Sequence, residues 1–207
     1  MKLSVQHLQR AWSDNHPQLP QIIERISSTL IEQIETLAAI ASAFSDFAKM
    51  PKAQNAKLDL MLILQNVVHL YSENEQVKVV LDKNDHHELF LYADKDYLIR
   101  IFSNLIKNAI QAIKPDKQGL VKVSVETFID HYVIAVEDNG QGISSEQREK
   151  IFVPNFTTKT TGTGLGLAMV KTLVEGMNGE VWFETEENKG SVFYVRLPAY
   201  QDKEHYA

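Results

Sequence analysis

The sequence predicts an α+β protein, in which an antiparallel or mixed sheet faces a layer of helices and a helical hairpin precedes both. Before Pro51, apolar residues recur at helical spacing, and after it helical and strand segments alternate irregularly. Beyond that point, segments with alternating or β-branched residues lie at hairpin separations, most clearly at residues 120–128 and 132–137. These strands do not alternate regularly with helices, which argues against a doubly wound parallel sheet.

Residues 1–50 are predicted to form the helical hairpin as a domain of their own. A short helix over residues 1–13 is separated by Pro17 and Pro20 from a longer helix that ends near residue 49. The longer helix carries an apolar stripe with seven-residue spacing, formed by Ile23, Leu30, Leu37 and Phe44, with Ile26, Ile40 and Phe47 beside them. The stripe could pack within one chain. Two helices alone cannot bury a stripe of this length, so a helix pair from a second chain is favoured.

Residues 57–200 are predicted to form the second domain, after a linker at residues 51–56. The expected helices lie at residues 59–73, capped by Asp59, and at 94–113, 144–151 and 163–177. The expected strands lie at residues 77–81, 88–93, 120–128, 132–137, 180–185 and 191–197. A polar turn at residues 82–87 joins the first two strands, and the last two form a hairpin.

Composition excludes several classes of protein. The formal net charge of −6 argues against nucleic acid as the main partner. There is no cysteine, so disulfides and thiolate chemistry are excluded. No apolar run approaches the roughly 18 residues of a membrane span, and residues 1–7 lack the apolar core of a secretion signal. We therefore expect a cytoplasmic chain without membrane contact of its own.

Two asparagines on the expected helix at residues 94–113 are the first candidates for chemistry. Asn104 and Asn108 are four residues apart and share one helix face. A neutral amide oxygen suits Mg²⁺ when triphosphate oxygens and water complete the octahedron, and Lys107 could reach a phosphate as a point charge. Taken alone, a pair of solvent-facing asparagines is the simpler explanation.

The end of the strand at residues 132–137 is the second candidate. Asp138 is followed by Gly140 and Gly142. A carboxylate here could accept a hydrogen bond from the exocyclic amine of adenine, whereas guanine would present a carbonyl and be repelled. The glycines would let a base lie close to the backbone. Asp-Asn-Gly is also good turn chemistry, so a simple strand-ending turn is the alternative.

The third and fourth candidates follow each other along the chain. Phe152 and Phe156 flank a polar, threonine-rich stretch that includes Thr158 and Lys159, as in a lid anchored by aromatic rings; an ordinary surface loop is the alternative. The segment from Gly162 to Gly166 has glycines at alternate positions and opens a helix, where backbone N–H groups can bind phosphate. Four such signals in this order indicate one Mg-nucleotide site.

These segments resemble the boxes of the ATP-binding half of a two-component sensor histidine kinase. Residues 104–109 resemble the N box, 138–142 the first glycine box, 152–156 the F box and 162–167 the second glycine box. The lid and the Gly-Thr-Gly-Leu-Gly-Leu segment look most like the nitrogen-regulation type. The resemblance covers residues 57–198 and implies the Bergerat-type ATP fold, an α/β sandwich shared with gyrase-type and chaperone ATPases.

The resemblance also implies residue roles, with ATP and Mg²⁺ as cofactors. Asn104, Lys107 and Asn108 would be catalytic, with Asn108 as the Mg²⁺ ligand. The implied nucleotide-binding residues are Asp138, Gly140, Gly142, Phe152, Phe156, Thr158, Lys159, Gly162, Thr163, Gly164, Leu165 and Gly166. Asn104 stands where ATP-hydrolysing relatives carry a Glu that activates water. We therefore expect slow hydrolysis, and a turnover like that of a dedicated ATPase would contradict this.

The resemblance implies a γ-phosphoryl transfer to a histidine, a response-regulator receiver domain as partner and a homodimer through residues 1–50. The family's acceptor motif, with an acid and a proline after the histidine, has no counterpart here; His7 lacks both. We therefore expect a fragment that begins just after its acceptor and cannot label itself, from a parent that could be anchored in the inner membrane. A natural protein that lost the acceptor is the alternative.

Other functions stay open at this point. The chain could be a regulatory nucleotide-binding module without kinase activity, or a Bergerat-type ATPase with a conformational role. A serine/threonine kinase such as an anti-sigma factor shares the ATP boxes but usually lacks so long a hairpin.

Overall fold

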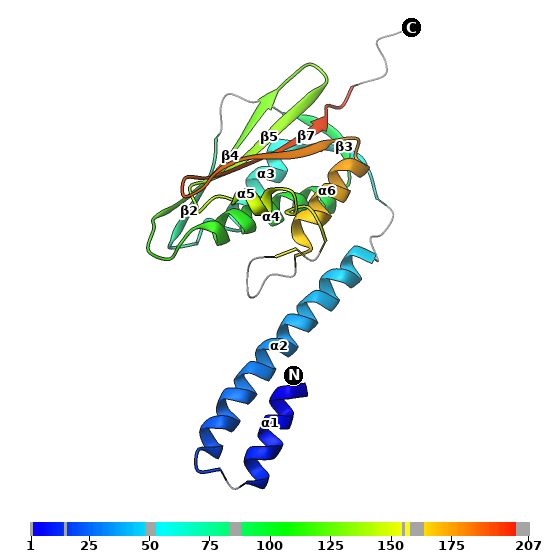
Figure 1. Ribbon diagram of the computed structural model, residues 1–207. Helices are drawn as coiled ribbons and strands as arrows, with labels where there is room; N and C mark the ends of the chain where they lie inside the picture. Colours follow the sequence, from blue (N-terminus) through cyan, green and yellow to red (C-terminus); the bar gives the residue numbers. More distant parts are fainter. Residues whose placement is uncertain are drawn as a thin grey trace.

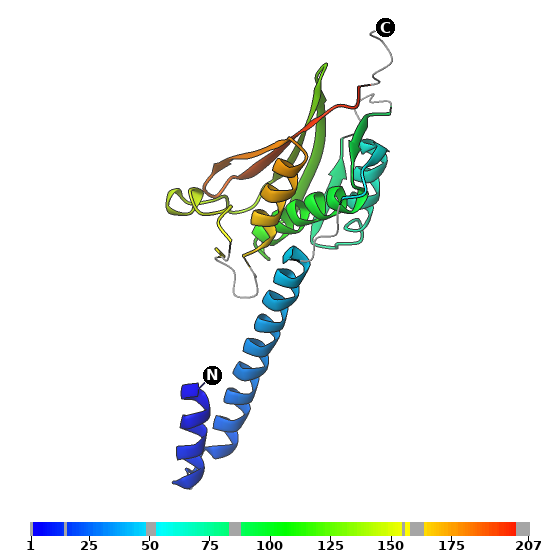
Figure 2. The ribbon, with the colours of Figure 1, turned by 90° about the vertical axis from the view of Figure 1, so that its right-hand side faces the viewer.

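The structure, a computed structural model, describes residues 2–14, 16–48, 53–82, 88–154, 156–157 and 164–201. A helical hairpin stands away from an α/β sandwich (Figure 1, Figure 2). The predicted fold class, a mixed sheet faced by helices and preceded by a hairpin, is confirmed. In the part of the chain that is described, no helix is long and apolar enough to cross a membrane.

The hairpin consists of α1 (Lys2–Ser13) and α2 (Leu19–Ala48). Its small core contains Ala11 from α1 and Ile22 and Ile26 from α2, with Leu8, Leu19 and Leu30 packed around them. The much shorter α1 covers only the first half of α2 (Figure 2). The expected stripe is therefore divided: Ile26 and Leu30 face α1, but Leu37 is 50% exposed. The side chains of Ile40, Phe44 and Phe47 lie outside the described residues.

A five-stranded sheet with the order β2-β4-β5-β7-β6 forms one layer of the sandwich. Its strands are β2 (Val77–Leu81), β4 (Gly119–Thr127), β5 (His131–Asp138), β7 (Gly190–Pro198) and β6 (Glu180–Glu186). The pair β2–β4 is parallel, and every other neighbouring pair is antiparallel. The expected hairpin of the last two strands is present as β6–β7.

The prediction that residues 77–81 and 88–93 pair as a hairpin is wrong. The strand β3 (Phe90–Ala93) pairs instead with β1 (Ala56–Asp59) in a separate two-stranded sheet. The partner of β2 is β4, and hydrogen bonds from Gly119 N to Gln76 O and from Asp82 N to Val123 O extend that ladder at both ends. The strand β1 was missed because it is only four residues long and has no clear alternation.

Helices α3 (Leu60–His69), α4 (Lys95–Ala112) and α6 (Gly166–Gly176) cover one face of the sheet (Figure 1). Asp59 caps α3 as predicted, since its side chain accepts a hydrogen bond from Met61 N at 2.9 Å. Asp94 caps α4 in the same way, from Asp96 N at 2.8 Å. Both carboxylates also sit at the positive end of the helix dipole.

Three predicted helix limits need correction. The helix α3 ends at His69 and not at residue 73, because residues 70–73 form turns. The helix expected at residues 144–151 is reduced to α5 (Ser145–Arg148), and the Ser144 side chain makes no capping hydrogen bond. The helix α6 begins at Gly166; residue 163, where it was expected to begin, lies outside the described residues.

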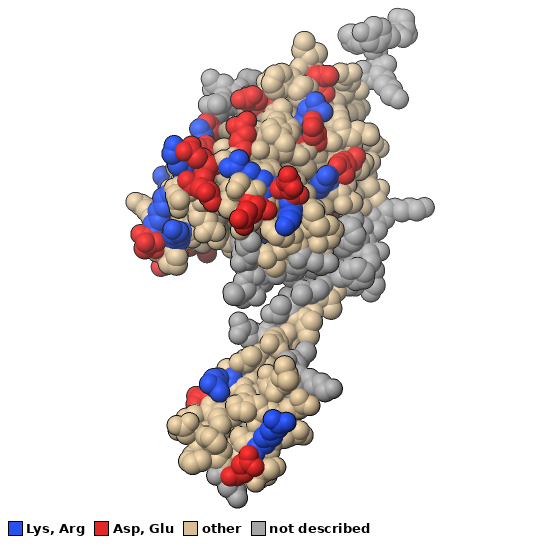
Figure 3. Space-filling model, viewed as in Figure 1, with Lys and Arg blue, Asp and Glu red and all other residues tan. Residues whose placement is uncertain are grey.

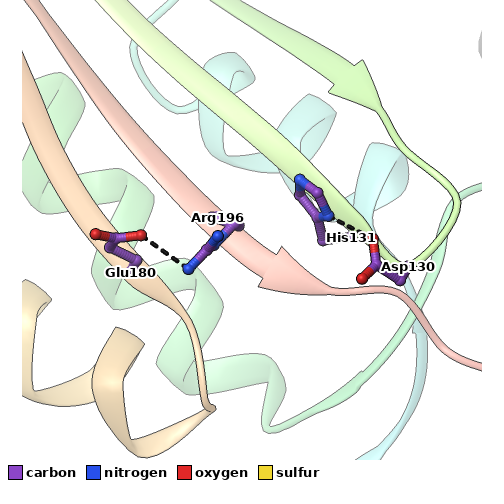
Figure 4. A network of polar contacts seen from close by, with 4 residues as sticks. All are labelled: Asp130, His131, Glu180 and Arg196. Atoms are coloured by element: carbon purple, nitrogen blue, oxygen red, sulfur yellow. Dashed lines mark hydrogen bonds and ion pairs between the residues drawn. The ribbon is translucent and has the colours of Figure 1, made fainter.

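The core lies between the helical layer and the inner face of the sheet. Fully buried side chains include Leu64, Leu98, Phe102 and Leu105 from the helices and Ile134 from the sheet. Alternation along the strands sends polar side chains to the outer face, where Arg196 pairs with Glu180 at 2.8 Å (Figure 4). At one end of this face the hydrogen bond from His131 lowers the pKa of Asp130. Positive and negative side chains are interspersed on the face shown in Figure 3.

Candidate functional site

The helix α4 runs through the centre of the candidate site. Asn104, Asn108 and Ala112 are spaced four residues apart and share one face, so they are separated by about 6 Å per step along the axis. Asn104 and Asn108 are half-buried, and Lys107 is exposed. Each end of this asparagine-bearing face meets a glycine-containing segment from elsewhere in the chain.

Asn104 meets the beginning of α6. A Cβ atom placed on Gly166 would lie 2.8 Å from Asn104 Oδ1. The amide group of Asn104 is oriented by its Nδ2, which donates to Arg100 O at 2.8 Å. The amide oxygen therefore faces the start of α6, and glycine at position 166 is what permits this approach.

The segment before α6 has the conformation expected of a glycine-rich helix start. Gly164 has a φ of +67°, which favours glycine. Leu165 is buried at the N-cap position and has no capping side-chain hydrogen bond, and its carbonyl accepts from Met169 N at 2.9 Å. Because a helix start has N–H groups without intrahelical partners, this end of α6 can bind an anion.

Asp138 lies at the end of β5 and is only 4% exposed. Its Oδ1 accepts a hydrogen bond from Gly140 N at 2.8 Å. A buried carboxylate is costly unless its oxygens are hydrogen-bonded, and this bond helps to stabilise Asp138 at the end of the strand. Across the ladder its partner is Ser191 on β7, also only 4% exposed.

Residues 139–144, which we call the base loop, lie against the last turn of α4. Gln141 N donates to Ala112 O at 2.9 Å. A Cβ atom on Gly140 would lie 2.6 Å from that same carbonyl oxygen and 2.7 Å from Asp138 Oδ1. Gly140 is therefore required by close packing, and it joins the buried carboxylate to the helix that carries the asparagines.

The base loop also contacts residues 186–190, which we call the β6–β7 turn. Asn188 N donates to Gln141 O at 2.8 Å. Gly142 has a φ of +70°, and a Cβ atom there would collide with Glu186 O. Gly190 has a φ of +135°, and a Cβ atom there would collide with Asp138 O. Two glycines thus permit the base loop and this turn to interlock.

The two aromatic residues of the predicted lid pack on the domain. The Phe152 ring makes edge contacts with Phe183 and Phe193, at centroid distances of 6.1 and 6.5 Å. Phe156 is half-buried against the same core. The expectation that these rings anchor the segment is supported, and their contacts are with the protein core. Thr158, Lys159, Gly162 and Thr163 lie outside the described residues.

The structure therefore brings together most of the described candidates through α4. Asp138, Gly140 and Gly142 gather at its C-terminal end, and Gly166 lies beside Asn104. Sequence reasoning missed Ala112, Thr185 and Ser191. Alternation along the last two strands could have identified Thr185 and Ser191, since both are polar residues at inward-facing positions.

The described residues contain no group of three or more histidine, cysteine or acidic side chains that could hold a metal ion. A divalent cation at this site would have to draw most of its ligands from a bound triphosphate and water, with an amide oxygen such as that of Asn108 as a protein ligand. Among the residues on the α4 face, the donor set is compatible with Mg²⁺ bound in this way.

Comparison with protein families gives one match that covers this site. Residues 93–201 match the family described as histidine kinase-, DNA gyrase B-, and HSP90-like ATPase. The sensor histidine kinase ZraS of Salmonella typhimurium is 32% identical over 176 residues, which are 84% of this chain and 37% of that protein. The nitrogen regulation protein NtrY of Azorhizobium caulinodans is 30% identical over 96% of this chain and 26% of its own length. The chain thus spans between about a quarter and two fifths of the length of these relatives.

Solved structures agree with this match. The catalytic domain of the histidine kinase ThkA is 32% identical and superposes with a TM-score of 0.63, over 70% of this chain and 95% of that domain. A second structure, ThkA in complex with the response regulator protein TrrA, has a TM-score of 0.68 and covers 96% of this chain and 57% of that one. At 24% identity, the second comparison supports the fold alone.

We predict that Gly142→Ala lowers the free energy of unfolding by about 1–3 kcal/mol, because the new Cβ requires a strained φ and meets the backbone of Glu186. Denaturant titration measures this. The matched control is Gly176→Ala, where nothing lies within 4 Å of the added Cβ. In this control stability should rise by up to about 1 kcal/mol, since the position is helical. Equal denaturation midpoints for Gly142→Ala and the unchanged chain would contradict the interlock.

Proposed function

We propose a function from one premise: the chain belongs to the family of histidine kinase-, DNA gyrase B- and HSP90-like ATPases, in which it carries the catalytic ATP-binding domain of a two-component histidine kinase. In this proposal the domain binds Mg-ATP and transfers its γ-phosphoryl group to a histidine. The phosphoryl group then passes to an aspartate of a response regulator.

The observation that carries the proposal is the buried carboxylate of Asp138 beside the asparagine face of α4. Asp138 would accept a hydrogen bond from the exocyclic amine of adenine, with Gly140 and Gly142 keeping the backbone close to the base. A guanine carbonyl at the same place would face a carboxylate oxygen with no proton between them. Asp138 would therefore select adenine over guanine.

The triphosphate would extend from the base loop along α4 toward α6. Asn108 would hold Mg²⁺ through its amide oxygen, the cation would supply positive charge to the phosphates, and Lys107 would reach a phosphate from the exposed side. The N–H groups at the start of α6 would bind the terminal phosphates, together with Lys159 and residues 162–164. Catalysis would rest on positioning and charge neutralisation, because Asn104 is too weak a base to activate water.

The receiver would be a separate response-regulator domain. ThkA, whose catalytic domain is 32% identical to this chain, has been crystallised with the response regulator protein TrrA. By analogy, this domain would work with a receiver partner of that class. His7 has no neighbouring acid and no following proline in the sequence, so we do not propose it as the acceptor.

We also propose that residues 1–50 are a dimerisation hairpin and residues 57–200 the ATP-binding domain. Large apolar side chains on the hairpin remain exposed, including Leu3 at 81%, Ile34 at 57% and Leu37 at 50%. Because α1 leaves the second half of α2 uncovered, a second hairpin could bury this surface in a four-helix bundle.

The nucleotide assignment predicts that Asp138→Ala weakens binding of a non-hydrolysable ATP analogue by about 10- to 100-fold, the effect of one lost hydrogen bond to a charged group. The affinity for the corresponding GTP analogue should not fall. Isothermal titration calorimetry with Mg²⁺ measures both. The matched control is Glu137→Ala, which removes the neighbouring carboxylate from the exposed, opposite face of β5. Wild-type affinity and selectivity in Asp138→Ala would refute the base-reading role.

The kinase assignment predicts label transfer from γ-labelled ATP to a supplied hairpin fragment that carries the acceptor histidine of a relative. Asn108→Ala should slow this transfer at least tenfold and reduce its dependence on Mg²⁺, because the cation loses its protein ligand. Asn66→Ala, an exposed asparagine on α3, is the control and should transfer at the wild-type rate. Equal rates for Asn108→Ala and wild type would remove Asn108 from the metal site.

The hairpin assignment predicts a dimer of the 23.5 kDa chain at micromolar concentration, measured by light scattering. Leu37→Asp should shift the population to monomer, because it places a charge in the exposed apolar stripe. Ser28→Asp adds the same charge at an exposed position on the opposite side of α2 from Leu37 and should remain dimeric. A monomer at every concentration would show that these residues do not dimerise.

A further inference from the structure

The hydroxyl group of Thr185 joins three segments of the chain. Thr185 lies on β6 at an inward-facing position and is half-buried. Its Oγ1 accepts a hydrogen bond from Ile143 N at 2.9 Å and donates to Gly190 O at 3.0 Å. It also lies 2.9 Å from Ser191 Oγ, the side chain opposite Asp138 in the ladder. One side chain therefore contacts the base loop, the end of the β6–β7 turn and the neighbour of Asp138.

Arg148 and Asn188 add hydrogen bonds between the same segments. The guanidinium group of Arg148 on α5 donates to Thr185 O at 3.3 Å and to Ile143 O at 3.5 Å. At the other side of the interlock, Asn188 N donates to Gln141 O at 2.8 Å. The base loop is thus held at Gln141 by the turn and at Ile143 by the Thr185 hydroxyl.

The base loop needs these hydrogen bonds because its own residues do not restrict it to one backbone conformation. Gly140 and Gly142 have more accessible backbone conformations than any other residue type. The loop has no helix or strand of its own between Asp138 and Ser145. Without the hydroxyl, Ile143 N–H and Gly190 C=O would each lose a protein partner, so the loop would move to recover hydrogen bonds with water.

We propose that Thr185 is a positioning residue of the nucleotide site. Its hydroxyl group fixes the base loop against the β6–β7 turn and so sets the geometry with which Asp138 meets adenine. This inference rests on the proposed function, in which Asp138 and the base loop bind the adenine base. Thr185 touches neither the base nor the phosphates in this account; it acts through Ile143, Gly190 and Ser191.

The test compares two variants of the complete chain. Thr185→Val keeps the shape of the side chain and removes the hydroxyl, whereas Thr185→Ser keeps the hydroxyl. Titration calorimetry with Mg²⁺ and non-hydrolysable ATP and GTP analogues is the readout. We expect Thr185→Val to bind the ATP analogue about tenfold more weakly, with GTP analogue affinity changed by less than about twofold. Thr185→Ser should restore both affinity and adenine selectivity.

A purely structural role predicts a different result. Loss of stability alone would lower the melting temperature of Thr185→Val and leave the adenine-to-guanine ratio of the folded protein unchanged. An unchanged ratio overturns the proposal, and so does a Thr185→Ser variant as weak as Thr185→Val. If the unchanged chain itself does not prefer adenine, the proposed function fails before the role of Thr185 is addressed.

A second variant covers the case in which Thr185→Val does not fold. Arg148 is exposed, so Arg148→Met should leave the core intact while it removes the donors to Thr185 O and Ile143 O. We expect about threefold weaker binding of the ATP analogue and a lower adenine selectivity, since these hydrogen bonds are long and solvent-exposed. Wild-type binding by Arg148→Met in that case would overturn the proposal.

Discussion

The contact between Gly140 and the last turn of α4 is the constraint on which the site depends. A side chain at position 140 would collide with Ala112 O, and the hydrogen bond from Gln141 N to that same oxygen requires the close approach. This contact fixes the end of β5, with its buried carboxylate, relative to the helix that carries Asn104 and Asn108. In the proposed function Asp138 and Asn108 bind two parts of one nucleotide, which requires a fixed separation between them.

Two further contacts hold the site together, one at Gly166 and one between the base loop and the β6–β7 turn. Gly166 brings the start of α6 beside Asn104, which places N–H groups without intrahelical partners at the far end of the same helix face. Gly142 and Gly190 let the base loop interlock with the β6–β7 turn, and Thr185 joins the two by hydrogen bonds. The glycines at these positions thus serve close approach between segments. A nucleotide would add phosphate contacts to a frame that is already formed by packing.

The sequence predicted the elements better than their partners. Alternation, helical periodicity and capping preference identified the α+β class, the β4–β5 and β6–β7 hairpins and the cap at Asp59, because these depend on neighbouring residues. The pairing of β2 with β4 and of β1 with β3 was not predictable in this way, since each joins residues more than thirty positions apart. The same limit applies to the candidate site: the motifs selected Asp138 and Asn104 as candidates, but the contacts of Ala112 and Thr185 with the base loop form only in the folded chain.

The central claim is that Asp138 reads the adenine base at the end of α4, and a crystal structure of the chain with Mg²⁺ and a non-hydrolysable ATP analogue tests it most directly. The measurement is the distance between the exocyclic amine of adenine and the Asp138 carboxylate. The account predicts a hydrogen bond of about 2.7–3.2 Å, with the triphosphate running along α4 toward Gly166. A base bound elsewhere, or one whose amine faces away from Asp138, would contradict it.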